Sequence, residues 1–176
     1  DDPQGVRPAD WLVRHRPLYR PGRALDLACG RGRNGLYLTR EGFQVEAWDR
    51  DVEALKELCS AAASLKLSAP TTRLVDLEQA PAIPSASFDL ITVFYYLQRD
   101  LMPQIVQALK PGGILVYETF LIDNHERFNH PRRREFCLER NELLSLFREL
   151  RVLAYREGAH VPDKGPFTAS LVAQRP

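Results

Sequence analysis

The sequence predicts an α/β fold built on a mostly parallel β-sheet that ends in an antiparallel hairpin. Three observations support this fold class. Short apolar runs alternate with helical patterns between residues 24 and 120, as strands do when crossover helices join them. A glycine-rich turn follows the first of these runs. Two runs rich in β-forming residues, separated by a turn, close the chain.

The first two predicted strands enclose a helix. Residues 24–28 are apolar apart from Asp26 and form the first strand. The following helix covers about 34–41, because Gly42 stands in the usual position for the end of a helix. The run at 44–48 is the second strand.

The middle of the chain contains a capped helix and a buried strand. Asp51 is a good N-cap for a helix whose apolar residues recur at helical spacing over 52–65. A short strand is expected at 72–75. Apolar residues occupy nearly every position of 88–94, which predicts a strand that is buried on both faces.

The alternation continues to residue 120 and then changes. A helix at 101–109 stops at Pro111, and 114–120 is rich in β-forming residues and predicts a fifth strand. Residues 121–138 are polar without a clean period, so we expect an excursion over the functional site. The remaining expected elements are a helix near 139–148 and two hairpin strands at 151–155 and 167–173.

Composition is that of an ordinary globular domain. The chain has 176 residues, 44% of them hydrophobic, and a net charge of +1, so a nucleic-acid partner is not expected. No apolar run approaches the roughly 18 residues of a membrane-spanning helix, and residues 1–20 lack the apolar run of a secretory signal. Cys29, Cys59 and Cys137 match neither a disulfide nor a zinc pattern, so we expect a cytoplasmic protein.

The glycine-rich turn predicts a cofactor site. Its glycines fit a GxGxxG pattern between a strand and a helix and are Gly30, Gly32 and Gly35 of ALDLACGRGRNG. Nicotinamide and adenosyl cofactors both use such a turn at the carboxyl edge of a sheet, so the pattern alone does not separate them. Arg31 and Arg33 could clamp phosphate, which is the strongest point in favour of NAD.

Three acidic residues at successive strand ends favour S-adenosylmethionine over NAD. Asp26 lies inside the first strand, where its carboxylate needs a cationic or donating partner; the ammonium of methionine supplies one, and a diphosphate does not. Asp49 ends the second strand, where a carboxylate accepts from the ribose hydroxyls of either cofactor. Asp76 ends the third strand and can accept from adenine, while Leu77 donates its backbone amide. The alternative is that these acids only accept hydrogen bonds from the turn or cap helices.

On these residues the chain resembles the class I S-adenosylmethionine-dependent methyltransferases, and more narrowly the tellurite-resistance group of small-molecule methyltransferases. The main passage is LDLACGRGRNGLYLTREGFQVEAWDRD at 25–51. LVDLE at 74–78, FDLI at 88–91 and LKPGGILVYETF at 109–120 add to it. The match weakens after residue 120.

The resemblance implies a Rossmann-like seven-stranded methyltransferase sheet with helices on both faces. It implies one domain, residues 1–176, with an N-terminal helix or lid segment (1–22), a cofactor-binding core (23–120) and a C-terminal part (121–176). Residues 6–19 either cover the cofactor or dock on the sheet edge. The implied cofactor is S-adenosyl-L-methionine. Its expected contacts are Asp26, Ala28, Gly30, Gly32, Arg33, Asn34, Asp49, Arg50, Asp76, Leu77, Glu78, Phe94 and Tyr95.

The implied reaction is methyl transfer to a small acceptor by in-line displacement. We expect a thiol, a chalcogenide or a small anionic metabolite. A thiol is partly ionised near neutral pH and needs little help, whereas a hydroxyl or an amine needs a general base. The alternatives are an RNA or protein methyltransferase and a non-catalytic regulator that binds S-adenosylmethionine.

Few residues suit a catalytic role. Tyr96, after the fourth strand, and His125, in the polar excursion, are the candidates. His125 and His130 are five residues apart, which is not the spacing of a helical metal site, so we expect no metal. The arginines at 132–134 form a basic cluster with His130, which either recognises an anionic acceptor or is a solvated loop.

Overall fold

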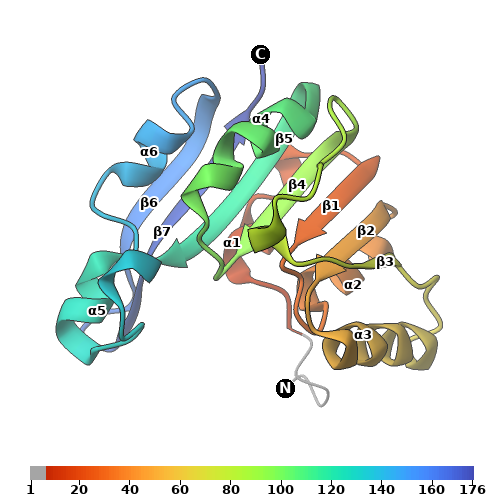
Figure 1. Ribbon diagram of the computed structural model, residues 1–176, viewed down its shortest axis with the longest axis horizontal. Coiled ribbons are helices and arrows are strands. Elements are labelled where there is room, and N and C mark those ends of the chain that lie inside the picture. The colour runs from red at the N-terminus through yellow and green to blue at the C-terminus, as the bar shows by residue number, and fades with distance from the viewer. Residues whose placement is uncertain (1–6) are drawn as a thin grey trace.

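One seven-stranded sheet organises the computed structural model, which describes residues 7–176. The strands are β1 (Arg23–Leu27), β2 (Gln44–Asp49), β3 (Thr71–Leu74), β4 (Phe88–Phe94), β5 (Leu109–Phe120), β6 (Arg151–Val161) and β7 (Gly165–Gln174). Their spatial order is β3-β2-β1-β4-β5-β7-β6 (Figure 1). The first five strands pair in parallel, whereas β7 is antiparallel to both β5 and β6. The predicted mostly parallel sheet with a C-terminal antiparallel hairpin is therefore confirmed.

Helices cover both faces of this sheet (Figure 1). They are α1 (Asp10–Arg14), α2 (Arg33–Arg40), α3 (Val52–Ser64), α4 (Met102–Ala108), α5 (Ile122–Phe128) and α6 (Glu142–Leu146). Short 3-10 helices cover Arg16–Leu18, Leu77–Gln79, Arg99–Leu101 and Arg134–Phe136. None of the described helices is both long and apolar enough to cross a membrane.

Side chains of β4 divide between two hydrophobic clusters. Ile91 and Val93 belong to a cluster that includes residues of α4 and α6, whereas Leu90 and Phe94 pack with residues of α1 and α2. Successive side chains of a strand point to opposite faces, so this division places one cluster on each face of the sheet. Burial of both faces explains why nearly every residue of β4 is apolar.

The C-terminal part contains more regular structure than the sequence predicted. The excursion at 121–138 includes α5, which has seven residues and is therefore too short to give a clear period. The predicted helix at 139–148 is reduced to α6. The hairpin is longer than expected because β6 continues past Tyr155, and Gly158 and Ala159 still pair with β7. β6 is an edge strand, so polar residues are tolerated along it and conceal its full length in the sequence.

The N-terminal segment docks on a face of the sheet. Trp11 and Leu12 of α1 are buried, and the Trp11 indole Nε1 donates to the Leu171 carbonyl at 3.2 Å. The Ala9 amide donates to Asn34 Oδ1 at 2.8 Å, which ties this segment to the start of α2. Val6, the first residue of the segment predicted to cover or dock, lies outside the described residues.

Candidate active site

The glycine-rich turn brings the end of β1 against α3. Gly32 has φ +86°, a left-handed conformation that glycine adopts without strain. A Cβ at Gly32 would lie only 2.1 Å from Leu58 Cδ1 of α3, so any side chain there would force Leu58 to move. Gly30 also has a positive φ of +57°, but a Cβ there would meet no atom within 4 Å. The turn is therefore closely packed beneath Gly32 and open at Gly30.

Asp49 connects the end of β2 to this turn. Its Oδ2 accepts from the Gly30 amide at 2.8 Å, and its Oδ1 accepts from the Asp51 amide at 2.9 Å. The Asp51 side chain in turn accepts from the amides of Glu53 and Ala54, which confirms it as the N-cap of α3. A carboxylate has about four acceptor sites, so Asp49 keeps capacity for a ligand hydroxyl.

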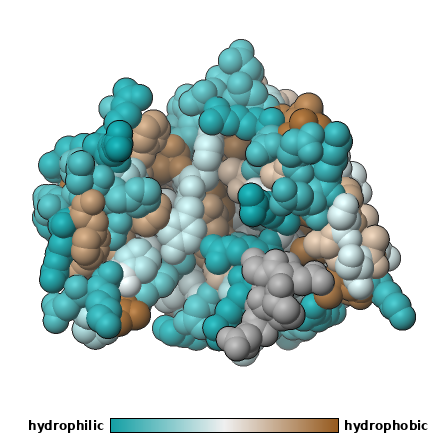
Figure 2. All heavy atoms as spheres, turned by 90° about the horizontal axis from the view of Figure 1, so that it is seen from below, coloured by the Kyte–Doolittle hydropathy of each residue, from teal (hydrophilic) through white to brown (hydrophobic). Residues whose placement is uncertain are grey.

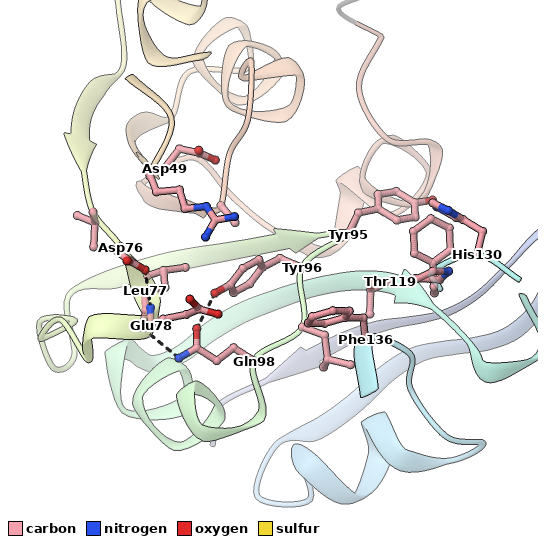
Figure 3. A pocket seen from close by; sticks show the side chains of 16 residues that line it. Asp49, Asp76, Leu77, Glu78, Tyr95, Tyr96, Gln98, Thr119, His130 and Phe136 are labelled. Atoms are coloured by element: carbon pink, nitrogen blue, oxygen red, sulfur yellow. Dashed lines mark hydrogen bonds between the residues drawn. The ribbon is translucent and has the colours of Figure 1, made fainter. Parts of the chain in front are cut away.

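A cavity of about 440 Å³ lies at the carboxyl ends of the strands and has two unlike ends (Figure 3). We call the first the acidic end; it is formed by Asp49, Arg50, Asp76, Leu77 and Glu78. We call the second the aromatic end; it is formed by Tyr95, Tyr96, Thr119, Phe120, His130, Pro131 and Phe136. In Figure 3 Tyr96 and Gln98 lie between the labelled acids and His130.

The acidic end suits a cationic ligand and opposes a phosphate. It presents three carboxylates against the single guanidinium of Arg50. Asp76 Oδ1 accepts from the Glu78 amide at 3.0 Å, as a cap does, so the capping interpretation holds for that oxygen. Like charges near a diphosphate would be unfavourable, whereas a sulfonium or an ammonium would be attracted.

Asp26 supplies a second observation in favour of a cation. It is 2% exposed, and its Oδ1 accepts from the Thr92 hydroxyl at 3.0 Å. Its Oδ2 is the one buried side-chain oxygen or nitrogen of the described residues without a hydrogen-bond partner. Burial raises the pKa of Asp26 to about 7, although Thr92, the Gly35 amide and Arg33 lower it by smaller amounts. A ligand ammonium reaching this carboxylate would stabilise its ionised form.

The two tyrosines after β4 have different partners. The Tyr96 hydroxyl donates to Gln98 Oε1 at 2.5 Å, and Gln98 Nε2 donates to the Leu77 carbonyl at 3.0 Å. Burial raises the pKa of Tyr96, so its phenol stays protonated and does not suit a general base. Tyr95 has φ +56° and donates from its hydroxyl to Glu118 Oε2 at 3.2 Å, which holds its ring beside that of Phe120.

The structure brings together eight of the residues predicted for the site. Those lining the cavity are Ala28, Asp49, Arg50, Asp76, Leu77, Glu78, Tyr95 and Tyr96. Asp26, Gly30, Gly32 and Arg33 belong to the strand and turn beside it, but they are not part of its wall. Asn34 and Phe94 are directed elsewhere, because Asn34 accepts from Ala9 and Phe94 packs in a hydrophobic cluster.

His125 and the arginine run do not reach the cavity. His125 Nδ1 is hydrogen bonded to the Pro131 carbonyl at 2.7 Å, and His130 is the histidine in the cavity wall. Arg133 pairs with Glu135 at 2.8 Å and Arg134 with Glu139 at 3.1 Å, all exposed. Among residues 7–176 no group of His, Cys, Asp and Glu is placed to hold a metal ion.

Sequence reasoning predicted Tyr95 and Tyr96 but missed Thr119, Phe120 and Phe136 in the walls of the aromatic end. Thr119 and Phe120 end β5, where neighbouring parallel strands finish at the same edge, and this position could have identified them. Phe136 is an isolated aromatic residue within a polar stretch, and only the folded chain shows that it lines the cavity.

Comparison with known proteins places the chain in a family. The family described as "Tellurite resistance protein TehB" matches residues 13–164. The chain belongs to the TehB family. A probable S-adenosyl-L-methionine-dependent methyltransferase TehB from Haemophilus influenzae is 30% identical over 143 residues, which are 78% of this chain and 49% of that protein. A malonyl-[acyl-carrier protein] O-methyltransferase from Enterobacter lignolyticus is 31% identical over 123 residues, 67% of this chain and 47% of that protein. The chain spans about half the length of these curated relatives.

Solved structures confirm the class I methyltransferase fold. TehB from H. influenzae superposes with a TM-score of 0.76 at 23% identity, covering 95% of this chain and 62% of that one. A methyltransferase from Mesorhizobium loti has a TM-score of 0.76 at 19% identity, covering 97% and 100%. The H. influenzae relative is S-adenosyl-L-methionine-dependent by name, which agrees with the cofactor expected from this sequence. The unpaired buried oxygen of Asp26 suits the ammonium of such a cofactor.

Proposed function

We propose that the chain transfers the methyl group of S-adenosylmethionine to a small-molecule acceptor. The observation that carries this proposal is the continuity of the cavity, whose acidic end suits the cofactor and whose aromatic end leaves room for a second molecule. A relative named trans-aconitate 2-methyltransferase, from Pseudomonas paraeruginosa, supports a small acceptor; it is 31% identical over 111 residues, 62% of this chain and 40% of that protein.

The surface supports a small acceptor over a protein acceptor. Figure 2 shows a largely hydrophilic face on which hydrophobic residues form separate patches. A protein docking site commonly offers a continuous patch with an apolar centre. The protein alternative therefore receives no support from this face.

The residues of the chain would bind and orient both reactants. Asp49 would accept from the ribose, Asp76 and the Leu77 amide would bind adenine, and Asp26 would pair with the ammonium. When bound, the cofactor supplies a methyl group attached to a sulfonium. The leaving group is a neutral thioether, which needs no acid to assist its departure. The protein then contributes chiefly alignment and exclusion of water.

Binding and turnover together test this function. Calorimetry should detect S-adenosylmethionine and its demethylated product S-adenosylhomocysteine, and the Asp49→Ala variant should bind them more weakly by about 1.5–3 kcal/mol, because a hydrogen bond to a charged group is lost. Demethylated product should accumulate with a small nucleophile present. Binding without turnover across a broad panel of metabolites would favour a regulator, and binding of NAD alone would contradict the assignment.

A further inference from the structure

The aromatic end of the cavity carries information about the acceptor. Its walls come from the ends of β4 and β5 and from the loop after α5. In Figure 3 Tyr95, Thr119, His130 and Phe136 lie together, away from Asp49 and Asp76. A molecule next to the reactive methyl would therefore contact these walls and not the acids.

This end provides no charged side chain for an anion. Its wall residues are aromatic or neutral, except for the titratable ring of His130. Arg133 and Arg134, which the sequence suggested as an anion site, are outside the wall and paired with glutamates, and the Arg133 guanidinium lies 5.4 Å from the Phe136 ring centroid. The Arg33 guanidinium lies 5.9 Å from the Tyr95 ring centroid and is also outside the wall. A carboxylate or oxyanion placed here would lose hydration, and the wall would offer it no Lys or Arg side chain.

The same walls favour a flat apolar ligand. The Phe120 ring lies 5.0 Å from the Tyr95 ring and 5.1 Å from the His130 ring, in an edge arrangement with the latter. Phe136 is 46% exposed although it is large and apolar, and it belongs to the cavity wall. Aromatic rings at these separations offer faces and edges to another ring. Covering an exposed aromatic residue at a cavity removes apolar surface from water, which favours binding of an apolar ligand.

We propose that the acceptor is an uncharged aromatic small molecule bearing a thiol, bound between Phe120 and Phe136. This inference rests on the proposed methyltransferase function. A thiol is favoured because it needs little assistance: no carboxylate lines this end, the Glu118 carboxylate behind the wall is hydrogen bonded to Tyr95, and His130 is the one imidazole of the wall. The acceptor sulfur forms a bond to the methyl carbon and its proton passes to solvent. The bond from that carbon to the cofactor sulfur breaks with its electron pair, giving S-adenosylhomocysteine and a methyl thioether.

A pair of probes that differ only in charge tests this inference. Phenylmethanethiol is the neutral aromatic thiol, and 4-(mercaptomethyl)benzoate adds one carboxylate. With S-adenosylhomocysteine bound, calorimetry should give an affinity for the neutral thiol at least about tenfold higher, because the carboxylate is desolvated without a partner. With S-adenosylmethionine, kcat/KM should follow the same order, and tellurite should be a poor acceptor.

Two exposed phenylalanines provide a matched comparison. Phe136→Ala should lower kcat/KM for phenylmethanethiol by about fivefold to tenfold through loss of aromatic contact, with cofactor affinity unchanged. Phe128, on the same excursion, lies outside the cavity wall, so Phe128→Ala should leave kcat/KM for phenylmethanethiol unchanged. Arg134→Gln, which removes an exposed ion pair to Glu139 outside the cavity wall, should also leave kcat/KM for phenylmethanethiol unchanged.

Three results would overturn the inference. They are preference for the carboxylate or for tellurite, loss of acceptor affinity in the Arg134→Gln variant, and failure of both thiols to bind beside S-adenosylhomocysteine. In each case cofactor binding would persist and the proposed function would stand. Absence of cofactor binding would instead contradict the function itself.

Discussion

Asp26 makes ligand-free stability depend on pH. Its pKa of about 7 exceeds the ordinary 3.8, so the folded chain holds this proton more tightly than the unfolded chain does. The contribution of Asp26 to stability is therefore greatest below pH 3.8 and decreases as the pH rises to about 7. Asp26→Asn should raise the free energy of unfolding at pH 8 by roughly 2 kcal/mol and leave it almost unchanged near pH 4, as measured in urea.

The same proton should compete with the cofactor. If the ligand ammonium pairs with ionised Asp26, affinity for S-adenosylhomocysteine should fall roughly tenfold between pH 7.5 and 5.5. Calorimetry on wild type and Asp26→Asn measures this, and the variant should bind weakly with little pH dependence. An equal pH dependence in both proteins would remove Asp26 from the ligand contact.

Gly32 and Gly30 form a natural pair for testing the turn. Both have positive φ, but only at Gly32 would a Cβ overlap a neighbour, Leu58. Gly30→Ala should therefore cost about 1 kcal/mol of backbone strain, whereas Gly32→Ala should cost about 2–4 kcal/mol, because overlap adds to the strain. Equal destabilisation in urea unfolding would show that packing against α3 does not select glycine.

At the scale of elements, Arg99 holds the loop that carries Phe136. Its Nε donates to Glu142 Oε2 at 2.5 Å and its Nη2 to Glu142 Oε1 at 2.9 Å. Further bonds reach the carbonyls of Glu135 at 2.8 Å and Cys137 at 2.9 Å. The Arg99 guanidinium keeps the pKa of Glu142 below its usual range, so the pair stays ionised at mildly acidic pH.

Loosening this loop should weaken binding of the acceptor and leave the affinity for the cofactor unchanged. Arg99→Ala should raise the acceptor KM about fivefold and cost about 1–3 kcal/mol of stability, since several bonds to a charged group are lost. Hydrogen exchange should quicken in residues 130–142 and remain unchanged in the glycine turn. Arg140→Ala, which removes exposed ion pairs to Asp123 and Glu126, is the control. A loss of cofactor affinity in Arg99→Ala would contradict the expectation that this loop serves acceptor binding alone.

Elements differed in how well the sequence predicted them. Strands β1 and β4 were evident because buried parallel strands are almost uniformly apolar. The short helix α5 and the far half of β6 were missed because their residues are stabilised by tertiary contacts and edge pairing, which leave no period in the sequence. His125 was chosen over His130 for the same reason: the fold of the loop decides which ring reaches the cavity.

At the scale of the whole molecule, the sequence predicted the acidic end of the cavity better than the aromatic end. Residues of the acidic end follow directly after β2 and β3, so a local pattern placed them at one sheet edge. The aromatic end combines strand ends with a loop that closes over them, and no short motif encodes that closure. The docking of α1 through Asn34 likewise joins residues 25 positions apart.

The order of these contacts along the chain has a consequence for how such a protein can change. The acidic end is formed by residues before position 79 and the aromatic end by residues from position 95 onward. Under the proposed function, variation in the second stretch would alter which molecule is methylated while the groups proposed to hold the methyl donor stay in place. A new substrate preference could therefore arise by exchanging one contiguous portion of the sequence, without changes in the portion that precedes it.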